Sequence, residues 1–194
     1  DLADHADWYC RIKPGTDVAF YNSMMQVIIE EDLVDRDYVD RFTENFEALR
    51  KTVAAYPPEQ AAKICGVPAD TIREVAVAFA TSGPAIVFWG MGISQHVYGT
   101  NNARCLIALA LLTGNVGRAG AGLHPLRGQN NVQGANDMGN NPVYHAGYQR
   151  VDDPAVREKF SKAWGVEVPE TPGYRLDQMM AGLHDDRIKA FYIM

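Results

Sequence analysis

Apolar residues recur at helical spacing along the first half of the chain. A helix is predicted from the Thr16–Asp17 turn, where either residue can cap it, to about Glu31. Charged and apolar residues alternate with the same period over residues 35–56, which predicts two short amphipathic helices. A further helix is expected after Pro68. Together these segments predict a mainly helical layer.

A continuous apolar run over residues 84–89 lies between Gly83 and Gly90. Such a run predicts a strand that is buried on both faces. The Gly-Met-Gly turn that follows leads into a helix over about residues 101–113. Its apolar part is far shorter than the roughly 20 residues that span a bilayer, so we expect a core helix and no membrane insertion. Strand, turn and helix form a β-turn-α unit, and ligands bind at such turns in open α/β sheets.

The remaining segments are shorter or less regular. Residues 8–12 and 188–194 predict strands, and residues 154–164 and 175–183 predict helices. Residues 114–151 are rich in Gly and Asn and lack periodicity, so we expect a long functional loop. Because the chain begins at Asp1 and stops on a predicted strand, we expect it to be an internal piece of a longer protein.

Composition places the chain among ordinary globular proteins, with 47% apolar and 22% charged residues. The formal net charge of -6 argues against nucleic acid as a partner, because phosphate backbones are bound by clustered Lys and Arg. The three cysteines lie far apart in sequence, unlike the close pairs of zinc and iron-sulfur sites. We expect them to be reduced and mostly buried, as in a reducing compartment such as the cytoplasm.

The turn GMGISQ, from Gly90 to Gln95, carries residue types that suit a bound cofactor. Its glycines let backbone N–H groups approach a phosphate closely. The spacing is not GxGxxG, however, and ordinary turn chemistry explains the glycines equally well.

A second candidate loop reads LHPLRGQNNVQGANDMG, from Leu123 to Gly139. Its amides offer both donors and acceptors, which suit a heterocycle such as a pterin or guanine, although a loop that bonds to itself explains them too. Arg127 offers a planar fork for a carboxylate, although a loop arginine is commonly a surface ion pair. His96 and His124 flank the two loops and are interpreted as ordinary polar residues, and no metal ligand is assigned.

The stretch from Gly90 to Gly139 closely resembles the catalytic subunit of molybdopterin-dependent formate dehydrogenases. The resemblance extends to HADWYCRIKPGTDVA near the start, ICGVPADTIREVAVAFA in the middle and IKAFYIM at the end. It implies an α/β fold with Rossmann-like, dinucleotide-binding mixed sheets flanked by helices, as a fragment of a larger multi-domain molybdopterin oxidoreductase. Residues 1–126 would be part of one Rossmann-like molybdopterin-binding domain, and residues 127–194 part of a second.

The resemblance also implies a role for individual residues. Arg127 would be the catalytic residue that orients formate, and Asp17 would bind a guanine in a pocket shaped by Gly15 and Thr16. Gly114 and Asn115 would form a supporting turn of the cofactor site. The other implied cofactor-binding residues are Gly90, Met91, Gly92, Gln95, Gly128, Gln129 and Asn130.

The implied cofactor is a bis-molybdopterin guanine dinucleotide with molybdenum or tungsten, accompanied by an iron-sulfur cluster whose ligands lie outside this segment. The implied reaction oxidises formate to carbon dioxide and passes electrons to iron-sulfur subunits of the same complex. Within the family, the segments QHVYGTNNARC and GLHPLRGQNNVQGA most resemble those of soluble, NAD-linked enzymes. Because the metal-binding Cys or selenocysteine lies upstream in relatives, we expect this fragment to be inactive by itself.

Two alternatives remain open from the sequence. One is another molybdopterin oxidoreductase, such as a nitrate reductase, in which a threonine typically stands where RGQNNVQGA begins. The Arg127 and the Gln129-Asn130-Asn131 run of this chain favour formate. The other alternative is a cofactor-free homologue that acts as an electron-transfer or scaffold subunit.

Overall fold

The computed structural model describes residues 2–192. The chain divides into two compact units, of which the first ends at Gly128 and the second begins at Gln129. We call them the N-terminal unit and the C-terminal unit. Whether each is part of a Rossmann-like molybdopterin-binding domain stays a prediction.

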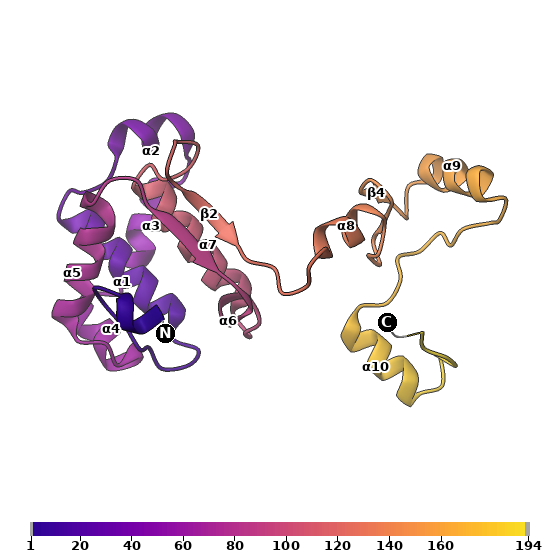
Figure 1. Ribbon diagram of the computed structural model, residues 1–194, viewed down its shortest axis with the longest axis horizontal. Helices are drawn as coiled ribbons and strands as arrows, with labels where there is room; N and C mark the ends of the chain where they lie inside the picture. Colours follow the sequence, from indigo (N-terminus) through magenta and orange to yellow (C-terminus); the bar gives the residue numbers. More distant parts are fainter. Residues whose placement is uncertain (1, 193–194) are drawn as a thin grey trace. The chain divides into compact units, whose positions relative to one another are not determined.

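The N-terminal unit combines a helical layer with one pair of strands (Figure 1). A short 3-10 helix, η1, covers Leu2–His5. The other elements, in chain order, are α1 (Asp17–Glu30), α2 (Arg36–Phe42), α3 (Phe46–Val53), α4 (Pro58–Cys65), α5 (Ala69–Thr81), β1 (Ile86–Trp89), α6 (Met91–Ser94), α7 (Gly99–Leu112) and β2 (Gly122–Pro125). The predicted helices at α1, α2, α3, α5 and α7 are confirmed, whereas α4 was not predicted.

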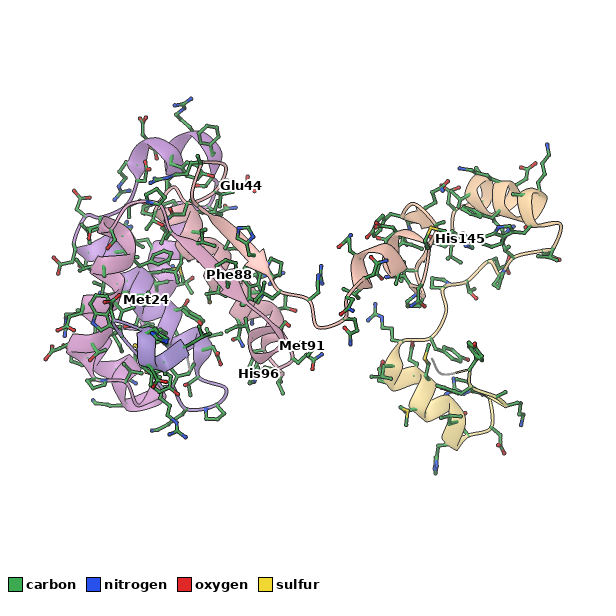
Figure 2. The ribbon with its side chains drawn as sticks, viewed as in Figure 1. Met24, Glu44, Phe88, Met91, His96 and His145 are labelled. Carbon is green, nitrogen blue, oxygen red and sulfur yellow. The ribbon has the colours of Figure 1, made fainter. Side chains whose placement is uncertain are left out.

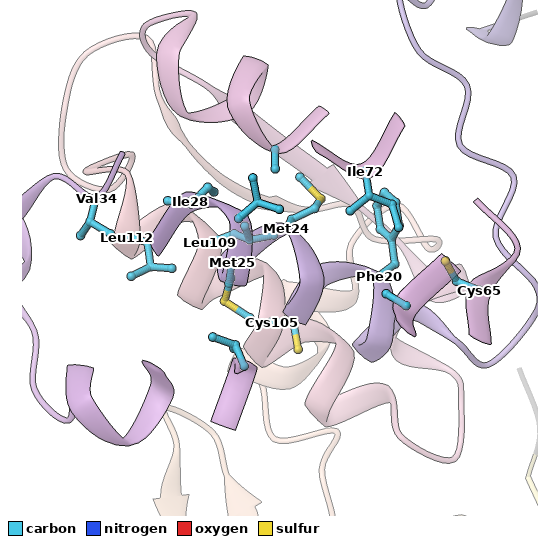
Figure 3. Close-up of a cluster of buried hydrophobic side chains, with 14 of the residues drawn as sticks. Phe20, Met24, Met25, Ile28, Val34, Cys65, Ile72, Cys105, Leu109 and Leu112 are labelled. Carbon is cyan, nitrogen blue, oxygen red and sulfur yellow. The ribbon is translucent and has the colours of Figure 1, made fainter. Parts of the chain in front are cut away.

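Helix α1 forms the centre of this layer and packs against α3, α4, α5 and α7. Its side chains Met25 and Ile28 are almost fully buried, as is Ile72 of α5. Figure 3 shows Met25 and Ile28 beside Leu109 of α7, and Ile72 beside Phe20 of α1, within one buried cluster. Burying a side chain of this size stabilises a fold by about 1.5–3 kcal/mol, so this cluster supplies most of the apolar stabilisation of the unit.

Strands β1 and β2 run parallel, in a register that pairs Ile86 with Gly122 and Trp89 with Pro125. The prediction that β1 is buried on both faces is wrong, because Ile86 and Phe88 are 47% and 60% exposed. In the described residues the helical layer covers only the face that carries Val87 and Trp89. The structure therefore shows a mixed α/β fold with small sheets, and the Rossmann-like sheet stays a proposal.

The C-terminal unit contains α8 (Val132–Asp137), β3 (Tyr144–His145), β4 (Gln149–Arg150), α9 (Pro154–Trp164) and α10 (Leu176–His184). Strands β3 and β4 form an antiparallel hairpin. Helix α9 begins where the Asp153 carboxylate accepts from the Ala155 N–H at 2.8 Å, and it ends at Gly165, whose φ of +70° favours glycine. The predictions of α9 and α10 are confirmed.

Three other predictions are wrong. Residues 8–12 and 188–192 are not strands, because an apolar run becomes a strand only where another backbone pairs with it, and residues 193–194 lie outside the described residues. The predicted loop over residues 114–151 contains β2, α8, β3 and β4. Thr16 does occupy the N-cap position of α1, one of the two residues predicted there, but its hydroxyl donates to the Lys13 carbonyl at 2.6 Å and does not bond to the helix.

Candidate functional site

Two of the predicted loops meet at the carboxyl ends of β1 and β2. Because these strands are parallel, the turn after Trp89 and the segment after Pro125 leave the sheet at the same end. The Leu126 N–H donates to the Trp89 carbonyl at 2.7 Å. We call Gly90–Gln95, which includes the short helix α6, the glycine turn. A Cβ placed on Gly128 would lie 3.5 Å from Met91 Cε, so Gly128 lies beside this turn. This end of a parallel sheet is where α/β proteins bind ligands.

The glycine turn is held by residues that the sequence reasoning missed. Asn102 of α7 is 2% exposed, and its Nδ2 donates to the Ile93 carbonyl at 2.9 Å. Gly99 has no room for a side chain, because a Cβ there would overlap the Ser94 carbonyl. An amide and a glycine in the first turn of a helix, as in YGTNN, are the signal that could have identified both. Figure 2 shows Met91 and His96 at the tip formed by this turn.

The predicted turn residues themselves remain accessible. Met91 is 49% exposed, and Gly92 and Gln95 are also exposed, while Gly90 is half-buried. The His96 ring nitrogen lies 2.7 Å from the Gly92 carbonyl oxygen, so this histidine belongs to the turn. Its role as a hydrogen-bonded polar residue agrees with the sequence interpretation.

Arg127 is exposed, and within residues 2–192 its guanidinium forms no ion pair or side-chain hydrogen bond. The alternative of an ordinary surface ion pair therefore finds no partner in the described part of the chain. A guanidinium that follows β2 directly, with its five donors unused, can bind a small carboxylate.

Asp17 lies buried at the first turn of α1, with 5% of its surface exposed. Among the described residues, none donates a hydrogen bond to its carboxylate. Gly15 has a φ of +81°, which favours glycine, and this turn brings the chain into α1. Its two oxygens are free acceptors, so a ligand with adjacent N–H donors fits this carboxylate.

Tyr21 lies one helical turn after Asp17. Burial, and then the negative charge of Asp17, raise the pKa of Tyr21 to about 12. Tyr21 lines a cavity of about 360 Å³ together with Trp89 and Ile93, so this part of α1 lies near β1 and the turn that follows it.

Gly114 and Asn115 lie at the opposite end of β1. Asn115 is 1% exposed, and its side chain accepts from the Ala85 N–H at 2.9 Å and donates to the Thr113 hydroxyl at 2.8 Å. Gly114 has no room for a side chain, because a Cβ would overlap the Asp35 carboxylate. Asn115 therefore holds the residue before β1 in place, and both ends of its side chain are used inside the protein.

The amide-rich stretch of the C-terminal unit divides into two kinds of residue. Gln129 and Asn130 are exposed, and their side chains have no hydrogen-bond partner within the described range. Asn131 instead caps α8 by accepting from the Gly134 N–H at 3.2 Å, and Gln133 donates to the Tyr148 hydroxyl at 3.0 Å. The interpretation as a self-bonded loop therefore holds for the later amides, while the first two are available for a ligand.

Some classes of site find no support in the described residues. Between residues 2 and 192, no three His, Cys, Asp or Glu side chains are arranged to hold a metal ion. In the same range, no helix is long and apolar enough to cross a bilayer. The cysteines are free, with Cys65 and Cys105 buried and Cys10 half-buried.

A family model described as molybdopterin oxidoreductase matches residues 2–194. The chain belongs to this family. Formate dehydrogenase H of Escherichia coli (strain K12) is 47% identical over 195 residues, which cover 100% of this chain and 27% of that protein. The F420-dependent formate dehydrogenase 1 subunit alpha of Methanococcus maripaludis is 40% identical over 192 residues, or 99% of this chain and 28% of that protein. The chain thus spans about a quarter of the length of these relatives.

A solved structure is similar over part of the chain. Acetylene hydratase from Pelobacter acetylenicus superimposes with a TM-score of 0.60 at 32% sequence identity, over 62% of this chain and 16% of that one. The family implies a cofactor in which a pterin holds molybdenum or tungsten. In the N-terminal unit, the unpaired Arg127 guanidinium fits an anionic group of this kind, and the Asp17 carboxylate fits its N–H donors. In the C-terminal unit, the exposed amides Gln129 and Asn130 offer both donors and acceptors.

Proposed function

We propose that this chain is part of the catalytic subunit of a formate dehydrogenase, which oxidises formate to carbon dioxide and a proton and releases two electrons. When bound, the molybdenum or tungsten pterin would accept these electrons and pass them to iron-sulfur clusters. The observation that carries the proposal is the unpaired guanidinium of Arg127 at the carboxyl ends of two parallel strands. The similarity to proteins named formate dehydrogenase supports the choice of substrate.

Arg127 would hold the substrate by its charge. Formate has three heavy atoms, so at about -1.5 kcal/mol per atom its binding is limited to roughly -4.5 kcal/mol, or about millimolar affinity. A charge-assisted hydrogen bond of about 1.5–3 kcal/mol would supply a large share of that energy. One arginine can therefore decide whether formate is bound in the reactive orientation.

The other predicted residues would hold the cofactor as a bis-molybdopterin guanine dinucleotide. Asp17 would accept from the N1–H and amino group of a guanine, since a carboxylate has two acceptors for adjacent donors. Gln129 and Asn130 would bond the pterin edge. The backbone of the Gly90–Gln95 turn and Gly128 would lie against the dinucleotide, and Gly114 and Asn115 would support the site from the other end of β1.

The proposal extends to the surrounding protein. Residues 1–126 would be part of one Rossmann-like molybdopterin-binding domain, and residues 127–194 part of a second. The electrons would leave through an iron-sulfur subunit of an NAD-linked complex in the cytoplasm.

Substrate turnover by the full-length protein tests this proposal. We expect formate to reduce an artificial electron acceptor, and we expect no reduction of nitrate by a reduced dye. Turnover of nitrate without turnover of formate would favour a nitrate reductase. Metal and pterin analysis separates the scaffold alternative, since a cofactor-free homologue would contain neither molybdenum, tungsten nor pterin.

A further inference from the structure

His145 of β3 has an unusual environment. Its Nε2 atom is buried, and no group in residues 2–192 forms a hydrogen bond with it. The imidazole stacks on Phe160, with ring centroids 4.5 Å apart and planes at 29°, and its edge meets Trp164 at 5.7 Å and 82°. Buried polar atoms nearly always have a hydrogen-bond partner, so a buried nitrogen without one is unusual. The contacts that this ring does make are with aromatic rings, which indicates that the ring itself stabilises the packing. We call His145, Phe160 and Trp164 the aromatic clamp; Figure 2 labels His145.

The aromatic clamp fastens the β3–β4 hairpin to α9. Phe160 and Trp164 are four residues apart on α9, so they lie on one face, and their rings are 4.9 Å apart. Phe160 is 8% exposed. A second link joins the same two elements, because Lys159 Nζ donates to Gln149 Oε1 at 2.7 Å.

The hairpin in turn holds α8. The Gly147 N–H donates to the Asp137 carbonyl at 2.7 Å, and Gln133 Nε2 donates to the Tyr148 hydroxyl at 3.0 Å. A Cβ on Gly139 would lie 2.7 Å from the Ala146 nitrogen, so the end of α8 rests directly on the hairpin backbone. Contacts therefore run without a gap from α9 through the hairpin to α8.

We propose that His145 is a positioning residue for the cofactor-binding amides. Gln129 and Asn130 directly precede Asn131, the N-cap of α8, so their backbone is continuous with the start of that helix and moves with it. This role rests on the proposed function, in which the two amides bond the pterin. The imidazole acts as an aromatic ring, and its nitrogen is dispensable.

Substitutions at His145 separate the ring from the nitrogen. His145→Phe keeps an aromatic face, whereas His145→Gln removes the ring and leaves polar atoms without partners. His184→Phe provides a matched control, because His184 is exposed in α10 of the same unit. The measurement is amide hydrogen exchange in the full-length protein at Ala135 and Met138, whose N–H groups donate to the Asn131 and Gly134 carbonyls of α8.

We expect His145→Gln to speed exchange at both amides by up to about tenfold, which is the scale of one lost aromatic pair. His145→Phe and His184→Phe should leave exchange within about twofold of wild type. Phe160→Ala, which breaks the aromatic clamp from α9, should reproduce the effect of His145→Gln. Unchanged exchange in both His145→Gln and Phe160→Ala would overturn the proposal.

Pterin content and formate kinetics provide the second readout. We expect His145→Gln to lower the pterin content or the turnover number while the Michaelis constant for formate stays nearly constant, and His145→Phe to restore both. A loosened α8 with unchanged pterin content and turnover would reject the positioning role. A wild-type protein without pterin would refute the proposed function, and the exchange comparison would still decide whether the aromatic clamp holds α8.

Discussion

Replacing Asn115 by alanine should weaken the attachment of β1 to the rest of the N-terminal unit. The Asn115 side chain is 1% exposed and joins the turn after α7 to the residue before β1, through the Ala85 N–H. Alanine leaves that N–H without an acceptor and removes the bond to the Thr113 hydroxyl, which still donates to the Leu109 carbonyl. The backbone N–H of residue 115 keeps its bond to the Ala110 carbonyl.

The size of the effect follows from these groups. Each of the two lost neutral hydrogen bonds costs about 0.5–1.5 kcal/mol, and the Ala85 N–H is only half-buried, so water replaces part of its bond. We therefore expect Asn115→Ala to lower the free energy of unfolding by roughly 1–3 kcal/mol, a sizeable part of the roughly 5–15 kcal/mol typical of a domain. Asn115→Asp keeps an acceptor for Ala85 but buries a charge, so it should be destabilising as well.

Urea unfolding followed by circular dichroism measures this effect. Asn101→Ala provides a control of the same chemistry, because Asn101 is exposed on α7 and should change stability by less than about 0.5 kcal/mol. If Asn115→Ala changes the unfolding free energy as little as Asn101→Ala does, the bond to Ala85 does not hold β1.

Three further predictions concern groups near the candidate site. Gly99→Ala should lower the melting temperature by several degrees in a thermal scan and loosen the glycine turn, because a Cβ would overlap the Ser94 carbonyl. Tyr21 should titrate near pH 12 by ultraviolet absorbance. Because the pKa of Tyr21 is higher in the folded than in the unfolded protein, its contribution to the free energy of unfolding is complete below about pH 10 and is lost as the pH rises to about 12. Two pKa units correspond to roughly 2–3 kcal/mol of unfolding free energy. Tyr21→Phe should abolish this loss, because phenylalanine does not titrate. Burial raises the pKa of Cys105 to about 11, so mass spectrometry should show slower alkylation by iodoacetamide than at the half-buried Cys10.

Helical periodicity predicted the elements whose pattern is local. The spacing of Tyr21, Met25 and Ile28 places α1 correctly, and Asp153, Pro154 and Gly165 mark the ends of α9 in the sequence itself. Residues 8–12 and 188–192 are apolar runs of the kind that predicts a strand, as residues 84–89 are, but they are not strands. A strand forms only where another backbone segment pairs with it, and the sequence does not show that partner. The wrong prediction that β1 is buried on both faces has the same reason, because an apolar side chain such as Phe88 does not specify which element, if any, covers it.

The site divides along similar lines. The glycine turn after β1 was predicted, because an apolar run and the turn chemistry that follows it are visible in the sequence. Arg127 was predicted as a loop residue, and the strand β2 that precedes it was not predicted. The contact between Met91 and Gly128 depends on the parallel pairing of two strands, which the sequence did not reveal. Asn115 resembles a ligand-binding amide in sequence, yet the structure uses both ends of its side chain internally, and Asn102 was missed for the same reason.

Formate-dependent reduction of an artificial acceptor by the full-length Arg127→Lys protein tests the central claim most directly, when each preparation is normalised to its molybdenum or tungsten content. Lysine keeps the charge but loses the planar fork. We expect turnover per metal to fall by about tenfold or more, while metal and pterin content stay close to wild type. Unchanged turnover per metal, or an equal loss of cofactor and activity, would contradict the assignment of Arg127 to formate.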